Sequence, residues 1–101
     1  MFTDKEIAEI VRQIIAIAAP ERVILFGSYA KGIATIRSDL DLLVIMKSNL
    51  YRHSKELFRP ILDKYVISID IHIYTIDEID ALQHEPYSFL GLVMGTGKTL
   101  Y

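Results

Sequence analysis

The stretch RVILFGSYAKGIATIRSDLDLLVIM, Arg22 to Met46, holds two apolar runs joined by a polar connection. The first run, Arg22 to Gly27, is short and rich in β-forming residues, so it predicts a buried strand. The second run, Asp39 to Met46, predicts another strand, although it begins with two carboxylates, Asp39 and Asp41. Charges beside a core are costly unless they are paired or bind a cation, so this pair indicates a site.

Helix and strand patterns continue on both sides of this stretch. Thr3 and Glu6 match a capping box, and apolar residues recur at helical spacing, so we expect a helix from Asp4 to Ala18. Val66 to Thr75 alternates isoleucine with polar residues and predicts a half-buried strand. The other expected elements are a helical turn over Ser28–Gly32, helical segments between Asn49 and Tyr65 that Pro60 kinks or divides, a helix over Ile76–Gln83, a helix over Pro86–Gly95, and a small edge strand or a disordered end over Lys98–Tyr101.

The order of these elements predicts an α/β (α+β) fold, a mixed β-sheet with helices packed on it, and one domain over residues 1–101. The net charge of −2 lacks the basic excess of proteins that bind the nucleic-acid backbone, so we expect no direct nucleic-acid binding. We also expect no membrane segment, because no apolar run approaches the required length. An N-terminus unlike a signal peptide and the absence of cysteine favour a cytoplasmic protein, and the sequence leaves a homo-oligomer open.

Three carboxylates are candidates for one metal site. Strand alternation places Asp39 and Asp41 on one face, with Cα atoms about 6–7 Å apart. Their oxygens can converge on Mg²⁺, which proteins bind through one or two carboxylates and substrate phosphate. Asp70 lies in the middle of the later strand and can approach the pair if the two strands are neighbours. Three carboxylates around one or two magnesium ions suit phosphoryl or nucleotidyl transfer.

Three residues between the two strands are candidates for binding the nucleotide phosphates. Gly27 lets the backbone adopt a positive φ or come close to a ligand. Ser28 offers a hydroxyl and an amide at the start of a helical turn, and Lys31 adds a positive charge one turn later. Structural interpretations stay open: Gly27 as a strand end, Ser28 as a helix cap and Lys31 as a solvated charge.

The segment ERVILFGSYAKGIATIRSDLDLLVIM, with Asp70 on a later strand, resembles the polymerase-β-like nucleotidyltransferase superfamily. Within it, the chain is similar to the minimal nucleotidyltransferases, the small antitoxin partners of HEPN-domain toxins, and its ending GKTLY is similar to theirs. This resemblance implies the polymerase-β-like fold. It also implies that Asp39, Asp41 and Asp70 are catalytic ligands of Mg²⁺, and that Gly27 and Ser28 bind the phosphates of ATP.

The resemblance further implies transfer of AMP from ATP to a hydroxyl, in this family a tyrosine of the partner HEPN toxin. A second hypothesis is a non-catalytic antitoxin that neutralises its toxin by forming a complex, which the apolar loop residues Ile33 and Ile36 favour. Those two residues depart from the family pattern and leave the choice of acceptor open. A third, weaker alternative is a transferase for a small molecule, but the chain lacks room for the extra helical domain that such relatives use.

Two other features receive structural interpretations. His72 shares a face with Asp70 and can line the site, but the alternation alone favours a surface or core-edge histidine. The stretch GTGKT, Gly95 to Thr99, is similar to the end of a phosphate-binding P-loop. The full motif needs a glycine where this chain has Leu92, and no buried strand precedes it, so we reject a P-loop.

Overall fold

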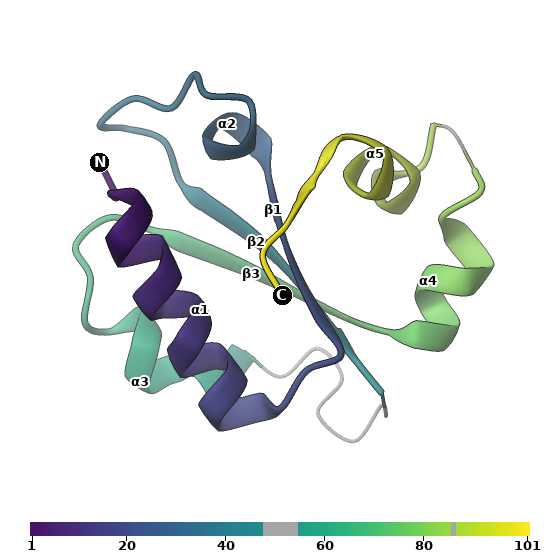
Figure 1. The fold of residues 1–101 in the computed structure, drawn as a ribbon, viewed down its shortest axis with the longest axis horizontal. Coiled ribbons are helices and arrows are strands. Elements are labelled where there is room, and N and C mark those ends of the chain that lie inside the picture. Colours follow the sequence, from purple (N-terminus) through teal and green to yellow (C-terminus); the bar gives the residue numbers. More distant parts are fainter. Residues whose placement is uncertain (48–54, 86) are drawn as a thin grey trace.

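The computed structural model describes residues 1–47, 55–85 and 87–101, which form a four-stranded sheet with helices on both faces (Figure 1). The helical and strand elements, in chain order, are α1 (Asp4–Ala18), β1 (Arg22–Phe26), α2 (Gly27–Ala30), β2 (Leu40–Met46), the 3₁₀ helix η2 (Lys55–Phe58), α3 (Arg59–Leu62), β3 (Ile69–Thr75), α4 (Ile76–Leu82), α5 (Phe89–Thr96) and β4 (Lys98–Thr99). The predicted α+β class, a mixed sheet with helices packed on it, is therefore confirmed.

The strand order in the sheet is β3-β2-β1-β4. β1 pairs antiparallel with β2 on one side and with β4 on the other, whereas β2 and β3 run parallel. Because β1 runs against β2, its end lies beside the start of β2, and the start of parallel β3 lies there too. One end of the sheet thus gathers three strand termini, and α2 follows directly from one of them.

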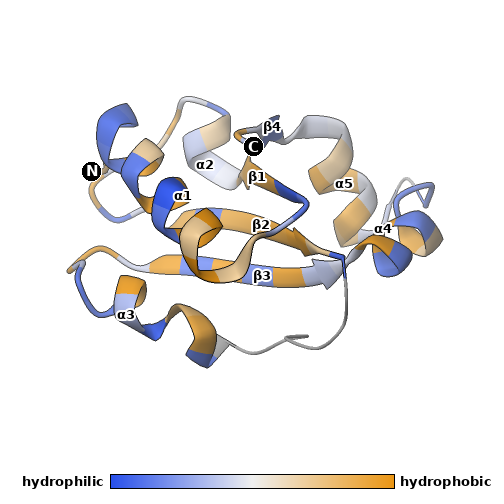
Figure 2. Cartoon of the chain, turned by 60° about the horizontal axis from the view of Figure 1, so that its bottom comes forward, coloured by the Kyte–Doolittle hydropathy of each residue, from blue (hydrophilic) through white to orange (hydrophobic). Residues whose placement is uncertain are grey.

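Side chains from opposite faces of the sheet form two separate hydrophobic cores. Figure 2 shows long hydrophobic stretches in β2 and β3, as this arrangement requires. One face packs against α1, η2 and α3, and its core includes Leu40, Leu42, Val44, Ile71 and Ile73 with Ile10, Ile14, Phe58 and Ile61. The other face packs against α4 and α5, and its core is formed by Ile24, Leu43, Ile45, Ile79, Leu90 and Val93. The alternation of side chains between the two faces, predicted for the strands that become β2 and β3, is therefore confirmed.

Capping boxes start two of the helices. The Thr3 hydroxyl accepts a hydrogen bond from the Glu6 amide, and the Glu6 carboxylate accepts one from the Thr3 amide, so α1 begins and ends at the predicted residues. Thr75 and Glu78 form the same arrangement at the junction of β3 and α4. The second box fixes the direction in which α4 leaves the sheet, toward the face opposite α1.

Several expected boundaries shift. β2 begins at Leu40 rather than Asp39, because the ladder to the neighbouring strand starts where the Leu40 amide donates to the Ser68 carbonyl, 3.0 Å away. β3 begins at Ile69 rather than Val66, whose side chain is fully exposed. Pro60 divides the predicted helical segment, since it lies in the first turn of α3 directly after η2. Residues 49–54 of that prediction, and Pro86, lie outside the described residues.

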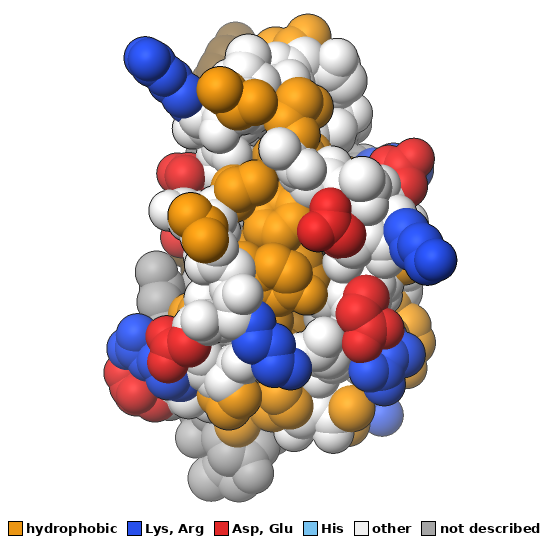
Figure 3. Space-filling view, turned by 90° about the vertical axis from the view of Figure 1, so that its left-hand side faces the viewer, with side chains coloured by type: hydrophobic (Ala, Val, Ile, Leu, Met, Phe, Trp, Pro, Cys, Tyr) orange, Lys and Arg blue, Asp and Glu red, His pale blue; other side chains and the backbone are white. Residues whose placement is uncertain are grey.

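Apolar side chains also reach the surface. Ile33 and Ile36, in the loop before β2, are 67% and 77% exposed. Figure 3 shows hydrophobic side chains gathered along the middle of one face, with charged side chains around them. A groove of about 480 Å³ lies between α1 and the C-terminal segment, where Val11, Ile15 and Leu100 line it. Across the described ranges, no helix has the length and apolar character that a membrane crossing demands.

Candidate active site

Asp41 and Asp70 lie side by side on neighbouring strands. They are direct partners in the parallel register of β2 and β3, so the adjacency expected if the strands were neighbours is present. Both side chains lie on the face that carries α4 and α5, as their alternation with buried Leu40, Leu42 and Ile71 requires. This position is the end of the sheet where β1 ends and α2 begins. The apolar neighbours anchor the strands while the two carboxylates remain reachable from solvent.

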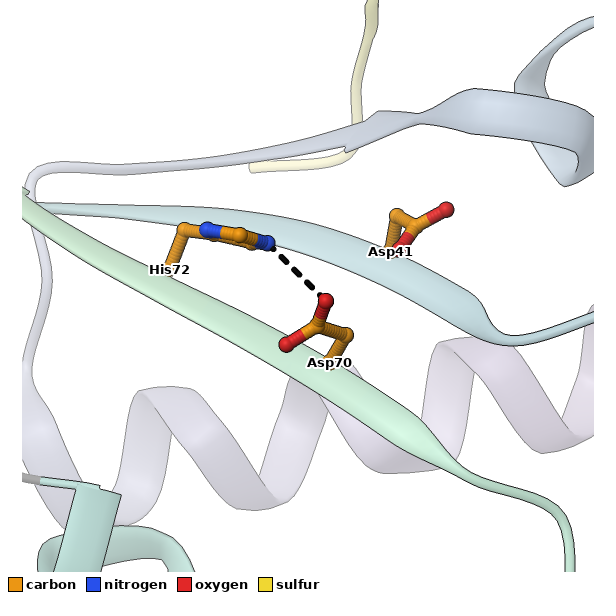
Figure 4. Close-up of side chains that lie close together, drawn as sticks. All are labelled: Asp41, Asp70 and His72. Carbon is orange, nitrogen blue, oxygen red and sulfur yellow. Dashed lines mark hydrogen bonds and ion pairs between the residues drawn. The ribbon is translucent and has the colours of Figure 1, made fainter.

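His72 joins the two carboxylates. Its Nε2 lies 3.2 Å from Oδ2 of Asp70, two residues earlier on the same strand (Figure 4). One ligand atom each from Asp41, Asp70 and His72 lies within 4.8 Å of the other two. The His72 ring packs against the rings of Phe26 and Phe89, whose centroids lie 5.4 Å and 5.2 Å from its own. The imidazole therefore has an apolar side against the core and a polar edge toward the carboxylates.

Gly27 lies directly against Asp41. Its φ of +72° belongs to the left-handed region that favours glycine. A Cβ added at this position would lie 2.2 Å from Oδ2 of Asp41, a distance that no carbon can tolerate. The positive φ therefore favours glycine here, and any larger residue would also push the Asp41 carboxylate aside. The sequence prediction that this glycine adopts a positive φ is confirmed, and the group that it contacts is the Asp41 carboxylate.

The other two predicted phosphate-binding residues follow Gly27 in the same turn. Ser28 is half-buried and is the second residue of α2, directly after the glycine that contacts Asp41. Lys31 ends α2, where its amide donates to the Gly27 carbonyl, 3.2 Å away. The Lys31 side chain is exposed. The geometry thus places Gly27 against Asp41, puts Ser28 next to it in the chain, and leaves the Lys31 side chain in solvent.

Asp39 is the predicted carboxylate that lies outside the group of Asp41, Asp70 and His72. It precedes β2, is exposed, and follows a turn in which the Ser38 amide donates to the Thr35 carbonyl. Its charge nevertheless acts on the site. Burial raises the pKa of Asp41 above its ordinary value, and the negative charges of Asp70 and Asp39 raise this pKa further, whereas His72 lowers it. The ionised form of Asp41 is therefore unfavourable in the folded protein, because it is partly buried and lies near two other negative charges.

This unfavourable charge predicts a specific pH dependence of stability in metal-free protein. A carboxyl whose pKa is raised on folding binds its proton more tightly in the native state, so stability falls as pH rises from the ordinary value of 3.8 through the raised pKa. Asp41→Asn removes this penalty. In thermal unfolding with a chelator, we expect the variant and the wild type to have similar midpoints at pH values below 3.8. As the pH rises above this value, the midpoint of the variant should become higher than that of the wild type. A difference that does not change with pH would contradict this explanation.

The donor set fits a divalent cation. Carboxylate oxygens are the ligands that Mg²⁺ prefers, and a cation would relieve the repulsion that raises the pKa of Asp41. The side chains of His72 and Asp70 are 30% and 41% exposed, so an ion or a phosphate can reach them from solvent. The groove beside α1 is on the opposite face of the sheet from this group, since its Leu25 belongs to the α1 core. The candidate active site is therefore at the carboxylates and not in the groove.

Carboxylates paired across two parallel strands, with a glycine-led turn against them, match the arrangement implied by the resemblance to polymerase-β-like nucleotidyltransferases. The chain belongs to the nucleotidyltransferase domain family, whose sequence profile matches residues 4–89. This range includes Gly27, Ser28 and all three predicted carboxylates. The predicted nucleotidyltransferase class is therefore confirmed at the level of the domain family.

Individual relatives agree with this assignment. A presumed protein adenylyltransferase of Methanocaldococcus jannaschii is 40% identical over 53 residues, which are 52% of this chain and 54% of that protein. The match thus spans about half the length of that relative. Two solved structures share the fold: a presumed nucleotidyltransferase of Sulfolobus solfataricus (TM-score 0.59, 19% identity, 96% of this chain and 78% of that one) and a toxin–antitoxin structure with AMP-PNP (TM-score 0.61, 20% identity, 93% and 72%). These two structures show that the chain shares the nucleotidyltransferase fold.

His72 lies in the candidate site, although the sequence interpretation favoured a surface or core-edge histidine. The available signal was its spacing, because a residue two positions after Asp70 on a strand shares its face. That spacing does not show which atoms meet, and a half-buried histidine usually has a structural role. The contacts that turn the ring toward Asp70 come from Phe26 and Phe89, which are remote in sequence.

Proposed function

We propose that this chain transfers the AMP moiety of ATP to a hydroxyl on a partner protein, most specifically to a tyrosine of a HEPN-domain toxin. The observation that carries this proposal is the register pairing of Asp41 with Asp70 beside Gly27. The family assignment supports nucleotidyl transfer. The name of the M. jannaschii relative, a protein adenylyltransferase, supports a protein acceptor, and the toxin–antitoxin structure with AMP-PNP supports a toxin partner and an adenine nucleotide.

The residues present suit Mg²⁺, and we propose Asp39, Asp41 and Asp70 as the carboxylates that hold it. When bound, the ion neutralises triphosphate charge and favours ionisation of the attacking hydroxyl. Asp41 and Asp70 form the inner part of the proposed site, and Asp39, in the loop before β2, would have to turn toward it when the ion binds. The protein preorganises the carboxylates on two rigid strands, so little rearrangement is required when ATP arrives.

The chain's own residues have distinct roles in the proposed reaction. Backbone amides at Gly27 and Ser28, with the Ser28 hydroxyl, donate to phosphate oxygens at the start of α2. The acceptor oxygen forms a bond to the α-phosphorus, the bond from that phosphorus to the β-phosphate bridging oxygen breaks, and pyrophosphate leaves. The hydroxyl proton passes to the Asp70 carboxylate, which lies beside the proposed position of the attacking oxygen. Lys31, at the rim, attracts the triphosphate by charge.

A second candidate function is neutralisation of the toxin by complex formation without catalysis. Exposed apolar side chains favour it, because Ile33, Ile36 and Val66 offer hydrophobic contact area to a partner. The two functions require different residues. Catalysis depends on the carboxylates, whereas binding depends on the apolar loop.

A cytoplasmic setting, expected from the sequence, is part of the proposed transfer reaction because ATP and an intracellular toxin are its substrates.

Neutralisation by Asp70→Asn separates the two functions. The variant is co-expressed with the protein encoded by the adjacent gene, and growth is measured against wild type. If AMP transfer is the mechanism, Asp70→Asn still binds the partner in a pull-down but fails to restore growth. Full rescue by Asp70→Asn would contradict the catalytic proposal and favour complex formation. Ile36→Asp is the complementary control, since it should weaken the pull-down while leaving the carboxylates intact.

A further inference from the structure

We propose that His72 is itself a metal ligand, so that the cation is held by one nitrogen and by carboxylate oxygens of Asp41 and Asp70. This inference rests on the metal requirement of the proposed function and assigns a residue beyond the three carboxylates. It also gives the site a chemical preference, because nitrogen from imidazole is a softer donor than carboxylate oxygen.

The distances suit shared coordination. Ligand atoms that occupy adjacent positions around a small divalent cation, each about 2.1 Å from it, lie about 3 Å apart. The Nε2 atom of His72 and Oδ2 of Asp70 are 3.2 Å apart, and one donor atom from each of Asp41, Asp70 and His72 lies within 4.8 Å of the other two. Figure 4 shows His72 and Asp70 on β3 and Asp41 on the neighbouring β2. The three donors thus come from two paired strands whose register fixes their spacing.

The aromatic neighbours of His72 hold its ring in the orientation that ligation needs. Phe26, at the end of β1, and Phe89, at the start of α5, contact the ring and each other at centroid distances between 5.2 Å and 5.4 Å. A ring restrained in this way loses little rotamer freedom on binding an ion. The hydrogen bond between Nε2 and Asp70 directs the same nitrogen at the site.

A nitrogen ligand changes which ions the site prefers. Mg²⁺ strongly favours oxygen ligands, whereas first-row transition metals accept imidazole nitrogen readily. The site should therefore bind Mn²⁺ more tightly than an all-carboxylate site would, while Mg²⁺ remains able to support catalysis through the carboxylates. Replacing His72 with Phe keeps the aromatic contacts and removes the nitrogen, so it isolates this effect. His84→Phe is the matched control, because His84 is exposed and follows α4.

The decisive measurement is electron spin-echo modulation of Mn²⁺ bound to the full chain without nucleotide, in which a directly bound nitrogen modulates the echo. We expect nitrogen modulation in wild type, a change in its frequencies when histidine is ¹⁵N-labelled, its loss in His72→Phe and its retention in His84→Phe. The labelling arm uses wild-type protein, so it does not depend on the variant folding. Mn²⁺ affinity should also fall by at least about tenfold in His72→Phe, with a much smaller change for Mg²⁺.

Two results would overturn the inference. Mn²⁺ that binds without histidine modulation, or with modulation that persists in His72→Phe, excludes His72 as a ligand. If the same preparation still transfers AMP with Mg²⁺, the proposed function stands and only the role of His72 is wrong. A wild-type protein that binds neither Mn²⁺ nor Mg²⁺ and transfers no AMP would overturn both proposals together.

Discussion

Asp41→Asn is expected to abolish AMP transfer and, in the same protein, to raise the thermal stability of the metal-free fold. Transfer should fall by about a thousandfold or more, because the variant loses the central carboxylate proposed to hold the cation. Stability should rise by a few degrees, because the substitution removes the charge that burial and Asp70 make unfavourable. The neutral amide is nearly the same size, so the strand register is preserved.

Measuring both quantities in one preparation gives this prediction its discriminating power. Thermal unfolding in a chelator reports the stability, and label transfer from ATP in Mg²⁺ reports the activity. Asp63→Asn is the control, since Asp63 is an exposed carboxylate beside α3, on the opposite face of the sheet. It should leave activity unchanged. An Asp41→Asn protein that is less stable without metal, or that retains transfer, would contradict the assignment of Asp41.

Gly27→Ala is expected to impair transfer strongly, whereas Gly32→Ala is expected to be tolerated. Both glycines have a φ of +72°, so alanine is strained equally at each. Their surroundings differ: a Cβ at Gly27 meets Oδ2 of Asp41 at 2.2 Å, whereas a Cβ at Gly32 meets nothing within 4 Å. The difference between the variants therefore isolates the contact with Asp41 from the backbone strain.

We expect transfer by Gly27→Ala to fall by about a hundredfold, since displacing a reacting group by about 1 Å has an effect of this size. Its free energy of unfolding should fall by about 1–3 kcal/mol, and that of Gly32→Ala by the lower part of this range. Steady-state transfer and urea unfolding measure these effects. Equal activities in the two variants would show that the approach of Gly27 to Asp41 does not matter for catalysis.

Local patterns made much of this fold predictable. The bounds of α1 follow from the Thr3 capping box and the spacing of its isoleucines, and the faces of β2 and β3 follow from alternation. These signals act over a few residues, so a single sequence contains them. The positions of Gly27 and Asp41 were predictable as candidates for the same reason.

The contacts that define the site depend on strand order and packing, which local patterns do not determine. Whether Asp70 meets Asp41 depends on β3 pairing with β2 in register, so the sequence supported this contact only conditionally. The orientation of His72 depends on Phe26 and Phe89, which other elements contribute. Asp39 was expected on the strand but lies just before it, because the ladder begins at Leu40. The sequence thus identified candidate residues, whereas the contacts between them became visible only in the folded structure.

The most direct test of the central claim is isotope transfer from ATP to the partner protein. Wild-type chain, Mg²⁺ and the folded product of the adjacent gene are incubated with ATP labelled at either the α- or the γ-phosphate. AMP transfer predicts label on the partner from α-labelled ATP alone, lost in Asp70→Asn and retained in Asp63→Asn. Label from γ-labelled ATP, equal labelling by Asp70→Asn, or no label on a folded partner that binds the chain would contradict the account.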